Sequence, residues 1–133
     1  MRQEPRWLSI NQIRMLHAES IQLFGGSPGI RDGTLLESAL DRAKNTWHYD
    51  ETVSLFELAA AYGFGIAKNH PFVDGDKRTS LLAIRSFLFI NGYHFNPEEV
   101  ETVTVIEGME AGRVDEMQLA DWIEANCSPR DKR

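Results

Sequence analysis

Apolar residues recur at helical spacing along most of the chain, and this pattern predicts helices joined by short polar loops. The two strongest segments, 54–68 and 77–91, are apolar on every side and predict two buried central helices. Pro71 is expected to end the first helix, because the residue before a proline is pushed out of the α region. Gly92 is expected to cap the end of the second. Residues 70–79 are therefore predicted to form a tight loop between two core helices.

Weaker apolar faces predict helices before this pair. Ser9 and Gln12 have the spacing of a capping box that opens a first helix. Its inner face is expected to carry Ile13, Leu16, Ser20, Leu23 and Phe24. A short second helix is predicted to start at Asp32 or Thr34 and to run through Leu40. Periodicity is lost over 42–52, which predicts a loop. His17, beside the first apolar face, is expected to be a structural histidine.

Two further helices are predicted after the pair. Asn96 and Pro97 are expected to be the cap and the first position of one, which Gly112 closes. Its expected inner face is Val100, Val103, Ile106 and Met109. Asp115 is expected to open the last helix, which packs through Leu119, Trp122 and Ile123. Residues 128–133 are expected to be a frayed tail.

Length and composition narrow the classes of protein. A chain of 133 residues is expected to form a single domain, with a core over about 9–127. The net charge of −6 argues against direct, sequence-independent binding to nucleic acid. The single Cys127 makes no internal disulfide, and no apolar run or leader predicts a membrane span or secretion. A cytoplasmic protein is expected.

The loop over 70–79, His-Pro-Phe-Val-Asp-Gly-Asp-Lys-Arg-Thr, is suited to binding an anion. Gly75 lets the backbone come close to a ligand, and the first-turn N–H groups of the next helix are unpaired and carry partial positive charge. Lys77 and Arg78 add cations at a helix start, where the helix dipole disfavours them. Such cations are best explained if a phosphate offsets the repulsion.

Two side chains of the same loop add chemistry to the anion site. Asp74 is a hard oxygen ligand suited to Mg²⁺ that is held jointly with the phosphates of a nucleotide. The imidazole of His70, a group whose ordinary pKa is roughly 6.5, is suited to take a proton from an attacking hydroxyl. A base, a metal ligand, an anion site and cations are the recurring parts of phosphoryl or nucleotidyl transfer sites.

This loop resembles the Fic/Doc family motif, His-Pro-Phe-x-Asp/Glu-Gly-Asn-Gly/Lys-Arg. Lys77, where most Fic enzymes carry glycine, and the short helical chain are similar to the Doc subgroup, the "death on curing" toxins of toxin–antitoxin pairs. The stretches 29–40 and 87–93 also resemble that subgroup, so the resemblance covers about 9–127. It implies an all-α, Fic-type bundle of about six helices with the active loop between the central two.

The resemblance also implies roles for the residues of the loop. It implies that His70 is the general base and that Asp74 is the magnesium ligand. It further implies that Gly75 and Asp76 form the phosphate nest, and that the triphosphate of ATP is held by the cations Lys77 and Arg78. Fic enzymes typically transfer AMP to a protein hydroxyl. Doc-type toxins are kinases that bind ATP the other way round and phosphorylate a threonine of elongation factor Tu, which stops translation. Lys77 favours the kinase, with AMP transfer as the alternative.

Asp76 departs from the motif, which has asparagine at this position. An asparagine amide donates a hydrogen bond to a phosphate oxygen, whereas an ionised aspartate only accepts. Two like charges about 4 Å apart repel by roughly 4 kcal/mol at an effective dielectric near 20, which would weaken nucleotide binding. Alternatively, Asp76 caps the following helix, a role that aspartate and asparagine fill equally. A third reading of the chain is thus a binding module with impaired nucleotide affinity.

The resemblance implies two protein partners. In the family, the stretch equivalent to 42–52 is a flap that lays a target segment across the active site by strand addition. Trp47, His48 and Tyr49 would then contact the substrate protein, although a passive loop over the core is an equal alternative. The second partner is a Phd-like antitoxin, whose C-terminal segment folds on binding and fills a groove beside the active loop.

Overall fold

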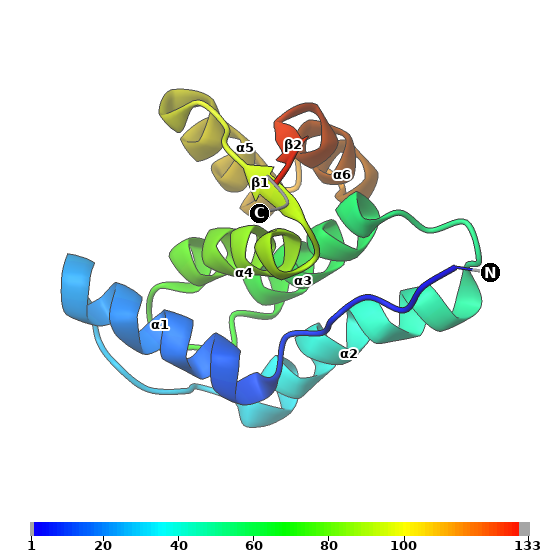
Figure 1. Cartoon of the computed structure of the whole chain (residues 1–133). Helices are drawn as coiled ribbons and strands as arrows, with labels where there is room; N and C mark the ends of the chain where they lie inside the picture. The colour runs from blue at the N-terminus through cyan, green and yellow to red at the C-terminus, as the bar shows by residue number, and fades with distance from the viewer. Residues whose placement is uncertain (1, 131–133) are drawn as a thin grey trace.

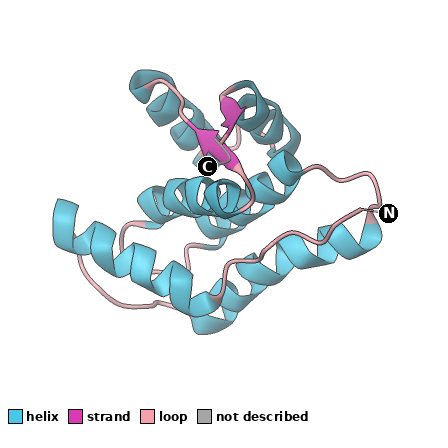
Figure 2. Cartoon of the chain, viewed as in Figure 1, coloured by secondary structure: helices cyan, strands magenta, loops and turns pink. Residues whose placement is uncertain are grey.

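The computed structural model describes residues 2–130, which form six α-helices and a two-stranded sheet (Figure 1). The helices are α1 (Ile10–Phe24), α2 (Gly33–Tyr49), α3 (Leu55–Asn69), α4 (Asp76–Ile90), α5 (Glu99–Glu110) and α6 (Glu116–Ala125). The strands are β1 (Tyr93–Phe95) and β2 (Cys127–Pro129). Helix dominates the fold, as Figure 2 shows, and the expected all-α bundle of about six helices is confirmed.

Helix α3 is the centre of the bundle and contacts α2, α4, α5 and α6 (Figure 1). Ser54 and Glu57 form a capping box at its start, and the run from Leu58 to Gly63 is buried without interruption. Gly63 lets α4 approach closely, since a Cβ there would lie 2.5 Å from Cδ1 of Ile84. The prediction of two buried central helices is confirmed, and Gly92 follows the second with a φ of 97°.

Helix α1 begins as predicted, with a complete capping box between Ser9 and Gln12. Ile13, His17 and Ser20 are buried, but Leu23 and Phe24 are 74% and 69% exposed. The prediction that these last two face the core is wrong, because the end of α1 projects past the body of the protein (Figure 1). Two large apolar side chains are thereby left at the surface beside α4.

Helix α2 continues to Tyr49, so the loop predicted for 42–52 is wrong over most of its length. Asp32 caps the start as expected, accepting from the N–H groups of Thr34 and Leu35. The inner face of α2 runs on through Ala43, which is fully buried, to Trp47. Small and aromatic residues at these positions weaken the apolar signal, yet they keep the helical spacing.

Helix α5 starts later than predicted and turns a different face inward. Its N-cap is Glu98, because the N–H of Asn96 is bonded to the carbonyl of Asn126 and the preceding segment is held beside the end of α6. The buried residues are Thr102, Ile106, Gly108 and Met109. Val100 and Val103 are 73% and 52% exposed, which corrects their predicted place on the inner face.

Both ends of the described chain are tied to the bundle. Strands β1 and β2 pair antiparallel with Tyr93 opposite Pro129, and the N–H of Arg130 donates to the carbonyl of Gly92. The predicted tail is therefore structured over 128–130, while 131–133 lie outside the described residues. Leu8 is 3% exposed, so the core begins before Ser9. Within residues 2–130, no helix has both the length and the apolarity that crossing a bilayer requires.

Candidate active site

The loop between α3 and α4 is anchored in the core by Phe72, which is 1% exposed. The ring of Phe72 stacks on His17 of α1, with centroids 3.9 Å apart. Nε2–H of His17 donates to the carbonyl of Asp74 at 2.7 Å. His17 is thus the structural histidine expected from the sequence, and it fixes the position of the loop against α1.

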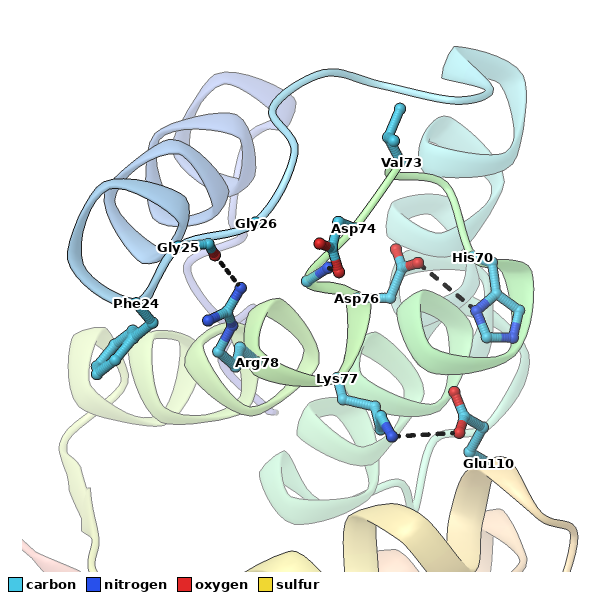
Figure 3. Close-up of a pocket in the computed structure, with 11 residues that line it drawn as sticks. Phe24, Gly25, Gly26, His70, Val73, Asp74, Asp76, Lys77, Arg78 and Glu110 are labelled. Carbon is cyan, nitrogen blue, oxygen red and sulfur yellow. Dashed lines mark hydrogen bonds and ion pairs between the residues drawn. The ribbon is translucent and has the colours of Figure 1, made fainter.

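The loop lines a cavity of about 510 Å³. All six loop residues singled out from the sequence line it: His70, Asp74, Gly75, Asp76, Lys77 and Arg78 (Figure 3). The end of α1 and the loop after it add Phe24, Gly25 and Gly26, and Glu110 of α5 closes the opposite side. A cavity of this size is within the ordinary range for a small-molecule site.

His70 stands at the end of α3 with its side chain 47% exposed. Its Nδ1 lies 3.5 Å from Oδ2 of Asp76 (Figure 3). An Nδ1–H that faces this carboxylate leaves the lone pair of the ring on Nε2, which is the form a general base requires. The backbone of His70 is left-handed, at φ 49° and ψ 55°, which costs a non-glycine residue roughly 1–2 kcal/mol.

Asp76 does not cap α4, so the capping prediction is wrong. The N-cap is Gly75, and Asp76 is the first helical residue. Its Oδ1 instead reaches back across the loop and accepts from the N–H of Phe72 at 3.0 Å. Burial raises the pKa of Asp76, while the Phe72 bond and the neighbouring His70 act in the opposite direction. The carboxylate therefore holds the loop closed and faces the imidazole.

The start of α4 has the features of an anion site. Gly75 is left-handed at φ 82°, and in the described chain no side chain caps this helix start. The first backbone bond back to the loop is from the N–H of Thr79 to the carbonyl of Gly75, so the earlier first-turn N–H groups are available to a ligand. Binding of a phosphate by Gly75 and Asp76 at this helix start stays a prediction.

The two predicted cations are present at this helix start, but each already has a protein partner. Nζ of Lys77 lies 3.4 Å from a carboxylate oxygen of Glu110. The guanidinium of Arg78 donates to the carbonyl of Gly25 at 2.8 Å and lies over the ring of Phe24 (Figure 3). Both cations are therefore held by the wall of the cavity, Lys77 through α5 and Arg78 through the end of α1.

The residues present fit a magnesium ion bound together with a nucleotide. Asp74 is exposed on the cavity, and its two carboxylate oxygens accept from the N–H groups of Gly75 and Ser27. Among residues 2–130 no cluster of three metal-ligating side chains occurs. Mg²⁺ is commonly held by one or two carboxylates and completed by phosphates and water, so one carboxylate is sufficient here.

Sequence reasoning missed the wall formed by the loop after α1. A Cβ on Gly26 would lie 2.8 Å from Oδ2 of Asp74 and 3.3 Å from Nη2 of Arg78, so a larger residue would have to displace these side chains, and the φ of 117° also favours glycine. The loop also bonds to the active-site loop through the isolated bridge between Ile30 and Phe72. The Gly25–Gly26 pair was the available signal, although nothing in the sequence showed that it meets residues 50 positions away.

The predicted flap residues lie elsewhere. Trp47, His48 and Tyr49 form the last turn of α2 and do not line the cavity. Trp47 packs edge-on against Trp7, under the guanidinium of Arg2. The flap conformation is therefore wrong for this segment, because the helix continues through it. Contact of the three residues with a target stays a prediction.

Comparison with known proteins identifies the family of this chain. The sequence profile of the Fic/DOC family matches residues 7–88. The protein kinase doc of Escherichia phage P1 is 33% identical over 119 residues, covering 89% of this chain and 93% of that protein. Toxin Doc of Mycolicibacterium smegmatis is 43% identical over 70 residues, which cover 52% of this chain and 54% of that toxin.

A solved structure shares the fold. BepC, a VirB-translocated effector protein from Bartonella tribocorum that was crystallised with bound AMPPNP, superposes with a TM-score of 0.50 at 19% identity. The match covers 74% of this chain and 51% of that chain, so this chain spans about half of the BepC structure. The profile covers more than half of the chain and the phage P1 relative nearly all of it, and the chain therefore belongs to the Fic/DOC family.

Proposed function

We propose that this chain is a toxin that transfers a phosphoryl group from ATP to a serine or threonine hydroxyl of a partner protein. One observation carries the proposal: a half-exposed imidazole, a carboxylate and an uncapped helix start surround a single cavity of about 510 Å³. The relative matched over 93% of its length is named a protein kinase, which supports phosphoryl rather than AMP transfer.

The roles follow from the positions. The N–H groups at the start of α4, with Lys77 and Arg78, would hold the triphosphate, and Asp74 would hold Mg²⁺, which supplies charge neutralisation on the phosphates. Nε2 of His70 takes the proton of the target hydroxyl. The hydroxyl oxygen then bonds to the γ-phosphorus, the bond from that phosphorus to the bridging oxygen breaks, and ADP leaves. A positioned base of this kind contributes roughly 10²–10⁴-fold in rate.

The proposed target is a translation factor such as elongation factor Tu, met in the cytoplasm. The name of the second relative, Toxin Doc, supports a toxin, and the family resemblance supplies this target class. The loop after α1 lines the cavity through Gly25 and Gly26, and its next residues, Ser27 and Pro28, face solvent. This loop is the surface on which we place the target segment.

The test removes the base. His70→Ala is expected to abolish growth inhibition and transfer while the fold stays intact, because Phe72 and His17 still anchor the loop. His94→Ala removes an exposed histidine outside the cavity and is the matched control. ATP labelled on the γ-phosphate should mark the target, whereas label from the α-phosphate would mean AMP transfer. Undiminished toxicity of His70→Ala would remove the base from the mechanism.

Asp76 favours one alternative, in which the chain is a binding module rather than an enzyme. Its carboxylate lines the cavity where the motif has an asparagine amide, and its charge opposes a bound phosphate. A chain that has lost nucleotide affinity in this way would act as an antitoxin-bound regulator. Transfer of label to any partner protein by the wild-type chain would exclude this alternative.

The proposed inhibitor is a Phd-like antitoxin that lies between α4 and α5. A second cavity there, of about 210 Å³, is lined by Leu81 on one side and by Val103 and Ile106 on the other. It shares Lys77 and Arg78 with the main cavity, so an occupant would lie directly beside the triphosphate site. Val103, which is 52% exposed, gives it an apolar rim.

The antitoxin proposal is tested separately from the transfer reaction. Val103→Glu places a charge on this rim and is expected to leave growth inhibition intact while weakening neutralisation by the co-expressed cognate antitoxin. Met117→Glu makes the same kind of change on α6, at a side chain that is 59% exposed. Full neutralisation of both variants would place the antitoxin elsewhere.

A further inference from the structure

The backbone of His70 is held in a conformation that its sequence opposes. Among residues 2–130 it is the one non-glycine residue with a positive φ. Its own Cβ disfavours the left-handed region, and Pro71 favours an extended backbone for the residue before it. Residues kept in such regions persist where their surroundings enforce them, and they cluster at functional sites.

The Arg31 side chain is bonded directly to this part of the backbone. Its Nε donates to the carbonyl of His70 at 2.7 Å, and its Nη2 donates to the carbonyl of Asn69 at 2.9 Å. These two carbonyls lie at the C-terminal end of α3, where the helix dipole is negative and favours a cation. The planar guanidinium spans both oxygens at once, which an ammonium group does not do with fixed geometry.

The backbone around Arg31 also bonds to the active-site loop. The N–H groups of Arg31 and Asp32 both donate to the carbonyl of Pro71, at 2.7 Å and 3.0 Å. The N–H of Val73 donates to the carbonyl of Gly29 at 3.1 Å. The backbone of residues 29–32 therefore bonds to the chain just after the active-site histidine, and the Arg31 side chain adds the bonds at the histidine itself and at Asn69 before it.

Arg31 is not among the residues that line the cavity. Its bonds are to the peptide that carries the imidazole. We propose that Arg31 is a positioning residue, whose guanidinium fixes the left-handed backbone of His70 and so holds the imidazole in its place at the cavity. The effect of Arg31 on the rate rests on the proposed function. Its effect on the backbone of His70 does not depend on that function.

The test uses two variants. Arg31→Gln removes the positive charge and the paired N–H donors of the guanidinium, whereas Arg31→Lys keeps the charge and removes the paired donors. Arg14→Gln, an exposed arginine on α1, is the matched control. We expect both Arg31 variants to lower the turnover of labelled ATP by about tenfold to a hundredfold, since a small misplacement of a reacting group has effects of this size. Mg-ATP affinity by calorimetry should stay within about twofold, because the phosphate-binding residues are untouched.

A second readout does not depend on activity. The Cα and Cβ chemical shifts and the three-bond H–N–Cα–H coupling of His70 report its φ, and both Arg31 variants are expected to move them away from left-handed values. Turnover is normalised to the folded fraction from denaturation curves. If Arg31→Gln does not fold, the comparison is made with Arg31→Lys alone. Wild-type turnover with unchanged His70 shifts would overturn the proposal. If the wild-type chain transfers no phosphoryl group, the proposed function is wrong. The NMR comparison would still decide whether Arg31 fixes the backbone of His70.

Discussion

Asp76 combines two contacts at the level of a single residue. One carboxylate oxygen holds the N–H of Phe72, and the other faces His70. An asparagine amide keeps the first contact through its oxygen, but it places a donor where the second carboxylate oxygen lies. The substitution relative to the family motif therefore changes the charge and the hydrogen-bonding capacity of the cavity while leaving the loop closed.

Asp76→Asn is expected to tighten Mg-ATP binding by at least about tenfold, because removing only 1.4 kcal/mol of charge repulsion has this effect on affinity. Calorimetric titration of Mg-ATP measures it. Asp41→Asn makes the same charge change on the exposed face of α2 and should leave the affinity unchanged. Equal affinities of the wild type and Asp76→Asn would show that the carboxylate does not oppose the phosphates.

Gly26→Ala is expected to lower both Mg-ATP affinity and transfer by at least about tenfold, because the new methyl group would displace Asp74 or Arg78. Gly25→Ala is a close control. Both glycines have a positive φ, 85° and 117°, but a Cβ on Gly25 would meet nothing within 4 Å. Both variants should lose similar stability from backbone strain, and only Gly26→Ala should lose binding. Identical affinities would mean that the wall is free to move.

At the level of elements, close approach between α3 and the helices on either side depends on two glycines in α3. A Cβ on Gly65 would lie 3.1 Å from Cα of Ala39 in α2, while one on Gly63 would overlap Ile84 in α4. Glycine within a helix normally reduces helix stability, so its presence here is explained by packing rather than by propensity. The active-site loop joins the two helices that meet at Gly63.

Gly63→Ala is expected to lower the free energy of unfolding by about 1–3 kcal/mol, since the buried Ile84 side chain must move. Adding Ile84→Val removes the overlapping Cδ1 and should restore part of the loss. Gly33→Ala, at the first position of α2 with open space around it, is expected to be neutral or stabilising by up to about 1 kcal/mol. Denaturant unfolding gives all three values, and an unchanged Gly63→Ala midpoint would contradict the packing argument.

At the level of the whole molecule, the N-terminal segment is bonded to the central helix of the bundle. The N-terminal segment runs beside α2 (Figure 1), and the N–H of Leu8 donates to the buried hydroxyl of Tyr62 in α3 at 3.0 Å. Burial raises the pKa of Tyr62 to about 12. One core tyrosine thus connects the first described residues to the central helix.

The raised pKa of the buried Tyr62 hydroxyl predicts a pH dependence of stability. An unfolded tyrosine ionises near pH 10, so between roughly 10 and 12 the unfolded state binds fewer protons than the folded state. Stability is fully present below that window and falls within it by up to about 1.4 kcal/mol per pH unit.

Tyr62→Phe should lack this slope and should cost about 1 kcal/mol at pH 7, because the Leu8 N–H loses its acceptor. Tyr49→Phe, at a side chain that is 89% exposed, is the control. Denaturant unfolding at pH 7 and from pH 9 to 12 measures both effects. Parallel curves for the wild type and Tyr62→Phe would contradict the argument.

The sequence by itself determined the helical class, the central pair of helices, the caps at Ser9, Asp32 and Asp115, and the loop between α3 and α4 that carries the candidate site residues. These features are encoded by neighbouring residues, through helical spacing and local hydrogen bonds. Only the tertiary structure decided that Gly26, Arg31 and Glu110 meet this loop, and that Asp76 reaches Phe72 instead of capping its helix. Such contacts depend on how whole helices pack, and no local pattern records that packing.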